Sequence, residues 1–263
     1  SDETFGVDFS VSEEIALSMG FSGDSSCRTE AGLLFELSHN EQSGGHVFLP
    51  REKLVAATAQ LLDCAPDAAE RSLDDLLARG SVVAERVANV DGCYLRRCHE
   101  AELYVCTRVS AMLSDKADAL RGAEKIIGEI EKEQGIRYAP LQRRAVELAA
   151  QEELLILTGG PGTGKTTSLR GITALFERMG LDVLLCAPTG RAAKRMGELC
   201  GKEAQTIHRL LGMSWNEQTG ETVFCKNEKE PLEADAVIVD ETSMVDLALM
   251  RALLCALRPG CRL

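Results

Sequence analysis

The sequence lacks the features that mark membrane proteins and disulfide-rich secreted proteins. No run of roughly 18 or more apolar residues occurs, so we expect no transmembrane helix. No signal-peptide pattern stands at its start. Ten cysteines are present, but none forms a C-x-x-C pair, and the nearest spacing, Cys93 and Cys98 followed by His99, is a weak basis for a metal site. We therefore expect buried or half-buried thiols in a reducing cytoplasm.

Basic charge is also scarce. The chain carries a net charge of −12, and residues 1–110 hold 9 Lys and Arg against 19 Asp and Glu. A chain this acidic is a poor general binder of polyanions, so any nucleic-acid site must be a local groove. Residues 188–212 could form such a groove, because this segment has more cations than carboxylates. Its carboxylates are Glu198 and Glu203, and its cations are Arg191, Lys194, Arg195, Lys202 and Arg209.

The rest of the composition is that of an ordinary globular protein. Hydrophobic residues make up 45% of the chain and charged residues 27%. A length of 263 residues suffices for one or two domains with buried cores. Because the first residue is Ser1 and not Met, we expect the chain to be part of a longer protein.

Residues 28–110 carry the pattern of a winged-helix domain. We expect helices over 29–38, from Pro50, and from Pro66 to Gly80, an extended piece at 45–50, and two strands joined by a turn at 89–92. The apolar residues expected to point inward from the second and third helices are Leu54, Val55, Leu61, Leu62, Ala69, Leu73, Leu76 and Leu77. Residues 1–27 are interpreted as the tail of a preceding element.

The third helix of such a domain ordinarily reads duplex DNA. Here that helix carries Asp67, Glu70, Asp74 and Asp75 against Arg71 and Arg79. An acidic face repels phosphates, so we expect a spacer or a protein-contact domain in preference to direct duplex reading.

Beyond this domain the pattern changes twice. Residues 99–134 are predicted to form one helix of alternating charge, of which 111–135 acts as a connector. Continuous apolar runs then alternate with helices, at 154–158, 182–187 and 236–240. Such runs are typical of buried parallel strands, so residues 136–263 are predicted to form an α/β domain.

Residues 158–167, TGGPGTGKTT, contain the Walker A pattern of a phosphate-binding loop. Its glycines allow backbone N–H groups to reach phosphate oxygens, and the following helix N-terminus adds partial positive charge. Lys165 is expected to reach the β- and γ-phosphates, and the Thr166 hydroxyl to ligate Mg²⁺. The predicted nucleotide-binding residues of the loop are Gly160, Pro161, Gly162, Thr163, Gly164, Lys165, Thr166 and Thr167.

Two carboxylates, Asp240 and Glu241, follow the last apolar run. Asp240 is expected to hold Mg²⁺ through water, and Glu241 to orient or deprotonate the attacking water. Transfer of phosphate to an acceptor rarely needs the second carboxylate, so the pair favours ATP hydrolysis.

The apolar run 182–187 ends at a loop that turns into a basic helix. Residues 188–190 are small and permit a polymer backbone to approach closely, at the end of the sheet where ligands bind in open α/β folds. The cations that begin at Arg191 suit phosphodiesters. A solvated basic helix without a ligand is the alternative.

Four stretches in this order, GGPGTGKTT, APTGRAAKRM, TIHRLLG and VDETSM, resemble superfamily 1 DNA helicases of the RecD type. The likeness is to the long form, in which helix–hairpin–helix and winged-helix-like elements precede the motor. AGLLFEL, GHVFLP and IALSMGFSGDSSCR carry that part, so nearly the whole chain is covered. The implied fold is a RecA-like P-loop domain over 136–263, with a parallel sheet incomplete at its C-terminus, preceded by a winged-helix-like domain over 28–110.

The resemblance implies further residue roles. YAPLQRRAV is similar to the adenine-reading motif, so Gln142 is expected to hydrogen-bond the adenine edge. The motifs that contact single-stranded DNA in this family correspond to Pro188, Thr189, Gly190 and Arg191, and to Thr206 and His208. For His208 by itself, a structural hydrogen bond is the better interpretation. The implied activity is ATP- and Mg²⁺-dependent 5′→3′ translocation on single-stranded DNA, with unwinding at duplex junctions, in repair or recombination.

The family also has parts that this sequence does not contain, namely a γ-phosphate sensor and a second motor domain. Residues 261–263 look like the start of a strand that would lie between 154–158 and 236–240. We therefore expect a gap in the sheet and unpaired edges. We expect the chain by itself to bind nucleotide, to hydrolyse it little and not to unwind DNA, since a motor needs two domains that close on ATP.

Two other interpretations stay open. The helicase portion of a conjugative relaxase has a similar motor, although the acidic winged-helix region and a total of 4 His count against it. A nucleotide-regulated binding module without turnover is the second, and the Asp240–Glu241 pair counts against it. A partner in a repair complex and a cytoplasmic location are further expectations.

Overall fold

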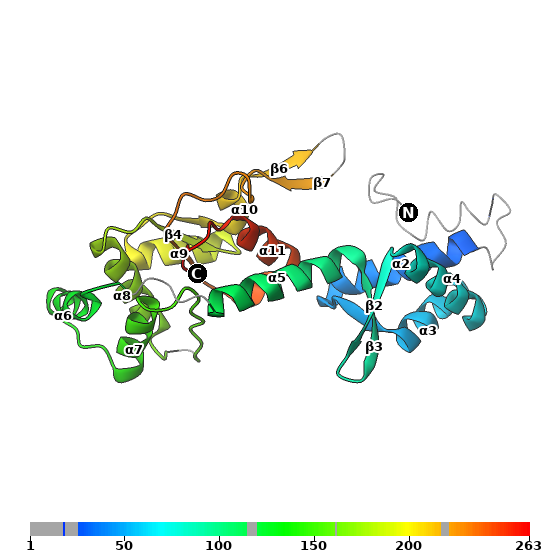
Figure 1. Ribbon diagram of the computed structural model, residues 1–263, viewed down its shortest axis with the longest axis horizontal. Helices are drawn as coiled ribbons and strands as arrows, with labels where there is room; N and C mark the ends of the chain where they lie inside the picture. Colours follow the sequence, from blue (N-terminus) through cyan, green and yellow to red (C-terminus); the bar gives the residue numbers. More distant parts are fainter. Residues whose placement is uncertain (1–17, 19–25, 115–119, 161, 217–220) are drawn as a thin grey trace. The chain divides into compact units, whose positions relative to one another are not determined.

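The structure is a computed structural model that describes residues 18, 26–114, 120–160, 162–216 and 221–263 (Figure 1). The chain divides into two compact units, and the main division falls between Leu103 and Tyr104, inside helix α5 (Arg96–Ser114). Asn216–Glu221 is grouped with the first unit, although the rest of its hairpin belongs to the second. No helix among the described residues is long and apolar enough to cross a bilayer. The tail expected over residues 1–27 falls almost wholly outside the described residues.

The elements of the first unit follow the order predicted for a winged-helix-like domain. They are α2 (Ser26–Gly44), β1 (Phe48–Pro50), α3 (Arg51–Leu62), α4 (Pro66–Arg79), β2 (Val82–Val87) and β3 (Val90–Leu95). The strands form an antiparallel sheet in the order β1-β3-β2, in which Cys93 lies opposite both Leu49 and Ala84. Leu33, Leu54 and Leu73 pack in the core between this sheet and the helices.

Proline and glycine mark the helix ends of this unit as predicted. Pro50 caps α3 with an extended backbone, and Pro66 is the first residue of α4. Gly80 ends α4 with φ of +70°, and its N–H bonds to the carbonyls of Leu76 and Leu77.

Two details of the first unit correct the prediction. The hairpin turn consists of Ala88 and Asn89, with φ of +45° and +71°, and not of residues 89–92. Gly92 therefore belongs to β3, where a side chain would meet the Phe48 ring. Leu61 was expected to be buried but is 40% exposed, because it lies at the margin of a face centred on Thr58 and Leu62.

The single helix predicted over 99–134 is wrong. Helix α5 ends at Ser114, and α6 (Ala123–Gln134) begins after Gly122. Gly122 has φ of +84°, a left-handed conformation that an α-helix cannot continue through.

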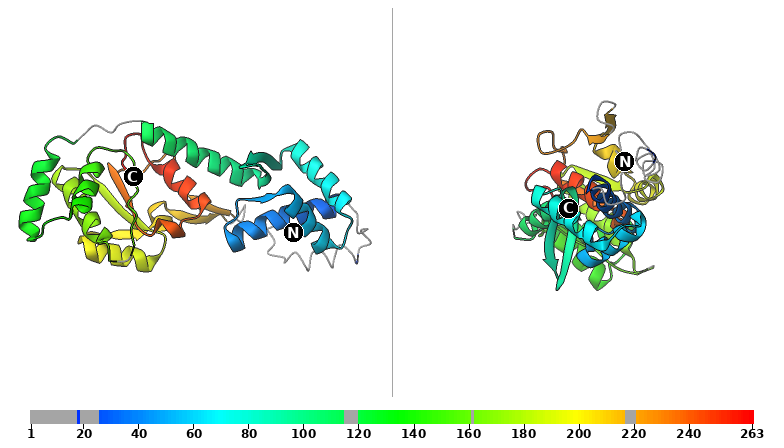
Figure 2. Two further views of the ribbon diagram at one scale, coloured as in Figure 1. Left: turned by 90° about the horizontal axis from the view of Figure 1, so that it is seen from below. Right: turned by 90° about the vertical axis from the view of Figure 1, so that its right-hand side faces the viewer.

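The second unit contains the expected parallel sheet. Strand β4 (Val183–Ala187) pairs in parallel with β5 (Ala204–Thr206) on one side and β8 (Ala236–Val239) on the other. The other elements are α7 (Pro140–Ala149), α8 (Lys165–Arg178), α9 (Gly190–Cys200), α10 (Ile207–Leu210), β6 (Met213–Asn216), β7 (Glu221–Phe224), the 3₁₀ turn η2 (Thr242–Met244) and α11 (Leu247–Ala256). Strands β6 and β7 form a separate hairpin (Figures 1 and 2). The predicted α/β class with a P-loop is confirmed.

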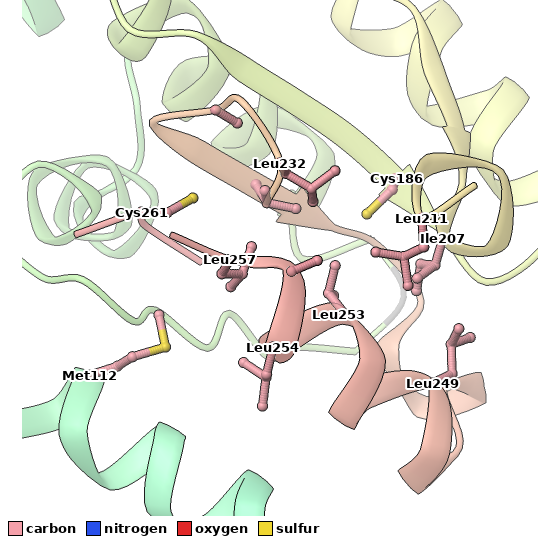
Figure 3. Packing of buried hydrophobic residues seen from close by; sticks show 13 residues of the cluster. Met112, Cys186, Ile207, Leu211, Leu232, Leu249, Leu253, Leu254, Leu257 and Cys261 are labelled. Atoms are coloured by element: carbon pink, nitrogen blue, oxygen red, sulfur yellow. The ribbon is translucent and has the colours of Figure 1, made fainter. Parts of the chain in front are cut away.

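Both faces of this sheet are buried. Cys186 of β4 points into one cluster, and Val183 and Leu185 point into another, as the alternation of a strand requires. Figure 3 shows the first cluster, in which Leu232, Leu253 and Leu257 approach one another beside β8. Met112 of α5 also belongs to it, so the C-terminal part of α5 is packed into the second unit.

The apolar run 154–158 is not a strand, which corrects the prediction. The N–H of Leu155 donates to the carbonyl of Leu263 at 2.9 Å, and the N–H of Leu263 donates to the carbonyl of Glu153 at 2.8 Å. No backbone hydrogen bond joins residues 156–158 to another described residue, and Ile156 is 76% exposed. Apolar side chains do not make a strand where a neighbouring backbone is missing.

Residues 261–263 lie between this segment and β8, as expected. The N–H of Arg262 donates to the backbone carbonyl of Asp235 at 2.9 Å, and the N–H of Val237 donates to the carbonyl of Arg262 at 2.8 Å. Beyond that pairing the sheet opens into a cavity of about 900 Å³, lined by Ile156 and Leu157 on one side and Val239 on the other. The predicted gap in the sheet is present.

Candidate functional site

Three neighbouring parallel strands end at one edge of the sheet. Ala187, the last residue of β4, lies opposite Thr206 at the end of β5, and Cys186 lies opposite Val239 at the end of β8. The segments that follow these strands carry residues 188–191, residues 206–208 and the Asp240–Glu241 pair. The sheet therefore gathers three separate motifs along the edge where ligands bind in open α/β folds.

The Walker A loop leads into helix α8, which begins at Lys165. Gly162 and Gly164 have φ of +75° and +83°, which favours glycine at both positions. A Cβ on Gly164 would also overlap the side-chain nitrogen of Gln142. Backbone geometry and a close approach therefore both explain the glycine before Lys165. Pro161 lies outside the described residues.

Lys165 is held by the loop itself. Its Nζ donates to the carbonyl oxygens of Gly159 and Gly160, the second at 3.3 Å. Thr163 Oγ1 donates to the Gly160 carbonyl at 2.9 Å. These are weak neutral acceptors for an ammonium group, and a phosphate would offer a stronger charged one. The residues present therefore fit the nucleotide phosphates that the motif implies.

Asp240 and Glu241 follow β8 in an unusual backbone geometry. The N–H of Asp240 donates to Cys186, which keeps this residue in register with β4. Asp240 Oδ1 accepts the N–H of Glu241 at 2.9 Å. Glu241 has φ of +55°, a conformation that costs free energy for a side chain of this kind and that is frequent at functional sites.

The loop and the carboxylate pair line one cavity. The residues that they contribute to the wall include Gly160, Gly162, Thr163, Gly164, Lys165, Thr166, Asp240 and Glu241. Thr166 and Asp240 thus supply two oxygen groups of the kind that Mg²⁺ prefers. Arg195 of α9, interpreted from sequence as facing phosphodiesters, lies in the same wall. Thr167 is half-buried and is not part of it.

Gln142 lies beside the loop. Its Oε1 accepts the N–H of Ala139 at 3.0 Å at the start of α7. This bond orients the amide so that its nitrogen lies against Gly164. The N-terminus of α7 and the phosphate-binding loop are therefore in direct contact.

The threonines of the two DNA-side motifs cap helices. Thr189 Oγ1 accepts the N–H of Ala192 at 3.3 Å and caps α9. Thr206 Oγ1 accepts the N–H of Arg209 at 3.2 Å and caps α10. Each hydroxyl thus has a structural role that is sufficient by itself to explain the residue type. Gly190 and Arg191 are exposed at the same edge.

His208 contacts the hairpin that follows it. Its ring centroid lies 6.2 Å from that of Phe224 in β7. The hairpin carries exposed apolar side chains, with Trp215 at 65% and Met213 at 52% exposure. Sequence reasoning missed this hairpin. The usable signal was the alternation of Met213 and Trp215 with polar residues, followed by a polar segment that contains Gly220 and then by the apolar pair Val223 and Phe224.

The buried cysteines are poor candidates for metal ligands. Burial raises the pKa of the Cys98 and Cys186 thiols to about 12, and that of Cys261 to about 11. A metal ligand must be a thiolate, which burial disfavours here. Across the described ranges, no group of three His, Cys, Asp or Glu residues is arranged to hold a metal ion.

Comparison with known proteins agrees with this geometry. A family model described as an AAA domain matches residues 142–263. The chain is 33% identical over 270 residues to the ATP-dependent RecD2 DNA helicase of Deinococcus radiodurans, an alignment that covers 99% of this chain and 36% of the relative.

Two further relatives share parts of the chain. The RecBCD enzyme subunit RecD of Mycolicibacterium smegmatis is 36% identical over 197 residues, which cover 66% of this chain and 34% of that protein. The ATP-dependent DNA helicase dda of phage T4 is 37% identical over 107 residues, covering 40% of this chain and 24% of that protein. The chain thus spans about a third of the length of the first two relatives.

Proposed function

Because this chain belongs to the RecD-like family of superfamily 1 DNA helicases, we propose that it carries the ATP-hydrolysing site of a DNA helicase. The observation that supports this most directly is that Lys165, Thr166, Asp240 and Glu241 all belong to the wall of one cavity. Those four residues come from the two ends of the domain sequence, and a nucleotide with its metal ion needs all four together.

The residues of the cavity suggest separate roles in ATP binding and hydrolysis. Lys165 exchanges its carbonyl partners for the β- and γ-phosphates of ATP. Thr166 and Asp240 hold Mg²⁺, which neutralises charge on the phosphate oxygens. Glu241 orients the attacking water and accepts its proton. Gln142, with its amide oriented by Ala139, donates to the adenine edge.

Single-stranded DNA is the proposed polymer substrate. Residues 188–191 and 206–208 follow adjacent strands at the edge that also carries the carboxylate pair. The exposed Arg191 and the N–H groups that open α9 suit the phosphodiester backbone. For the whole protein we propose 5′→3′ translocation and unwinding at duplex junctions in repair or recombination, in the cytoplasm. A second motor domain in cis and a repair-complex partner complete that proposal.

The first unit is proposed to contact protein or to act as a spacer. Two cations of its α3–α4 region are already engaged, since Arg51 pairs with Glu70 and Asp74, and Arg79 pairs with Glu30. Within the described residues, Lys53 of α3 and Arg71 of α4 have no such carboxylate partner. These two available cations lie among acidic neighbours and give phosphates little attraction. The proposed boundaries remain 28–110 for this domain, 111–135 for the connector and 136–263 for the motor domain, after a tail over 1–27.

The test is ATP binding and hydrolysis by this chain, with and without a single-stranded oligonucleotide. Lys165→Ala should reduce ATP affinity by at least about tenfold, because it removes the charged partner of the phosphates. Lys53→Ala in α3 is the matched control, since that lysine is exposed in the other unit. Equal ATP affinity in the Lys165 variant and the control would refute the assigned site.

A nucleotide-regulated module without turnover is the second candidate, and the self-bonded state of Lys165 is the observation that favours it. Glu241→Gln separates the two functions. A hydrolysing site should keep its ATP affinity and lose about a hundredfold or more of any measurable turnover. A module without turnover should be unaffected by the change.

A further inference from the structure

A cluster of three side chains lies away from the nucleotide cavity and joins three parts of the second unit. Tyr104 of α5 donates its hydroxyl hydrogen to Glu228 Oε1 at 2.9 Å, although 124 positions separate them in the chain. The guanidinium carbon of Arg251, on α11, lies 5.9 Å from the centre of the Tyr104 ring. These three residues are absent from the wall of the nucleotide cavity. The cluster therefore needs an explanation other than nucleotide binding.

The loop that carries Glu228 has a defined shape. Asn227 Oδ1 accepts the N–H groups of Lys229 at 2.9 Å and Glu230 at 3.3 Å, and the Asn227 N–H donates to Glu230 at 3.1 Å. A side chain that satisfies two backbone donors in this way holds a tight turn. Glu228 is thus presented to Tyr104 by an ordered loop.

The same loop is tied to the root of the β6–β7 hairpin. The N–H of Cys225 donates to Gly212 at 3.3 Å, and the N–H of Lys226 donates to Leu211 at 3.0 Å. Leu211 and Gly212 directly follow α10, the helix that Thr206 caps and that contains His208. The loop of Glu228 is therefore joined by backbone hydrogen bonds to the point where α10 leads into the hairpin.

The other side of the cluster is firmly packed. Tyr104 lies against the core that contains Leu253 and Leu254 of α11, and Met112 of the same helix α5 is buried there. Figures 1 and 2 show α11 alongside the C-terminal part of α5, with the hairpin extending away from the sheet. Burial, together with Cys255 and Glu228, raises the pKa of Tyr104 above its ordinary value of 10.0, so the phenol keeps its proton further into alkaline pH.

We propose that Tyr104, Glu228 and Arg251 form an anchor that fixes α10 and the root of the β6–β7 hairpin for DNA binding. The residues of this anchor are positioning residues, because they act on the polymer through Thr206 and His208. An isolated two-stranded hairpin is marginally stable in water, so its direction must be set by contacts at its root. The DNA part of this inference rests on the proposed function, whereas the structural part does not.

The anchor is tested first by hydrogen exchange of the β6 and β7 amides in the full chain. Tyr104→Phe keeps the ring and its contact with Arg251 but removes the bond to Glu228, and should speed exchange there about fivefold to tenfold. Tyr138→Phe is the matched control, since the buried hydroxyl of Tyr138 has no hydrogen-bond partner among the described residues. Hairpin exchange in Tyr104→Phe equal to that of the control would overturn the anchor.

A pair of changes at Glu228 separates the hydrogen bond from general disturbance of the loop. Glu228→Gln keeps an acceptor oxygen for Tyr104 and should stay within about twofold of the wild type in hairpin exchange. Glu228→Ala should match Tyr104→Phe, and the double variant should add little to either single change. Additive effects in the double variant would show that the two residues do not act through one bond.

The second measurement is affinity for a labelled single-stranded oligonucleotide, beside affinity for ATP. Tyr104→Phe should weaken DNA binding about threefold to tenfold while ATP affinity stays unchanged, since the cluster lies outside the nucleotide cavity. Faster hairpin exchange with unchanged DNA affinity would overturn the positioning role. If the wild-type chain itself binds no oligonucleotide, the proposed DNA function fails, and the exchange data still decide whether the anchor exists.

Discussion

The two units of the chain differ in how their cations are paired and in how closely their interiors are packed. In the first unit, Arg51 is engaged by two carboxylates of α4, and the helices close around a core whose Leu73 is fully buried. In the second unit, Lys165 meets only carbonyl oxygens among the described residues, and it lies in the wall of a large cavity. The first arrangement leaves little for a charged ligand to gain, whereas the second leaves a cation and two carboxylates available.

This contrast shows why the net charge of the chain is a poor guide to its ligands. An overall charge of −12 disfavours polyanions, yet the acidic excess lies mostly in the first unit, where part of it is already paired. Screening at physiological salt limits the reach of these charges to about 8 Å. The groups at the strand ends of the second unit therefore decide what binds there.

The largest expected effect would separate the stability of the two units. Leu73→Ala removes a fully buried side chain from the core it shares with Leu33 and Leu54, and should lower the free energy of unfolding of the first unit by about 2–5 kcal/mol. Hydrogen exchange of α4 should report this loss. Trp215, the single tryptophan, should report an unchanged second unit by its fluorescence.

Leu61→Ala on α3 is the control for that change. Leu61 is partly exposed, at the margin of the buried face, so this change should cost less than about 1 kcal/mol. If the Trp215 transition moves together with α4 exchange in Leu73→Ala, the two units unfold as one, and the contrast drawn above does not extend to stability.

A smaller effect is expected at the packing of α7 on α8 in the second unit. A Cβ on Gly171 would lie 2.6 Å from the Tyr138 hydroxyl oxygen and 3.1 Å from Val146, so Gly171→Ala should destabilise this unit by about 1–3 kcal/mol. Thermal unfolding followed by Trp215 measures it. Adding Tyr138→Phe removes the nearest atom and should recover part of the loss.

Gly128→Ala on α6 is the matched control in the same unit. No atom lies within 4 Å of the added Cβ, so alanine should stabilise the helix by up to about 1 kcal/mol. A loss of stability in this control, equal to that of Gly171→Ala, would mean that the close approach to Tyr138 is not the cause.

A gain of stability is expected at the hairpin turn of the first unit. Ala88 adopts φ of +45°, which glycine tolerates without strain, so Ala88→Gly should raise the free energy of unfolding by about 1 kcal/mol. Asn89→Gly should change it by less, because asparagine already tolerates the left-handed region. Chemical denaturation of both variants decides the point, and a destabilised Ala88→Gly would contradict the turn geometry.

The smallest effect at neutral pH concerns Tyr94, and it grows only in alkali. Burial, with Glu102 and Glu85 nearby, raises the pKa of Tyr94 from its ordinary value of 10.0 to about 12. Between these values the unfolded chain loses its proton before the folded chain does, so the first unit should lose stability as pH rises from 10 to 12. Tyr94→Phe should reduce that slope in urea unfolding measured across this range. An unchanged dependence of stability on pH in Tyr94→Phe would refute the raised pKa of Tyr94.

Several features followed from short stretches of sequence. Pro66 and Gly80 mark the bounds of α4 because each restricts or frees the backbone at its own position. The positions of Thr189 and Asp240 shortly after β4 and β8 followed from apolar runs of the length of a buried strand. Motif order was enough to identify the family. Proline, glycine and short apolar runs act on the backbone at their own positions, so they can be read without knowledge of the fold.

Other features depend on partners far away in the chain. The run 154–158 has the composition of a strand but lacks a neighbouring backbone beyond Leu155, so no strand forms there. Composition reports how well side chains tolerate burial. It carries no information on which backbone will supply the hydrogen bonds.

The sequence by itself thus determined the Walker A loop, the carboxylate pair and the helix ends marked by Pro50, Pro66 and Gly80, because each depends on residue types at fixed short spacings. The tertiary structure decided which of these groups share one cavity, that Gln142 packs against Gly164, and that Tyr104 meets Glu228. The physical reason is that such contacts join residues far apart in the chain, where pairing depends on the fold as a whole and not on local preference.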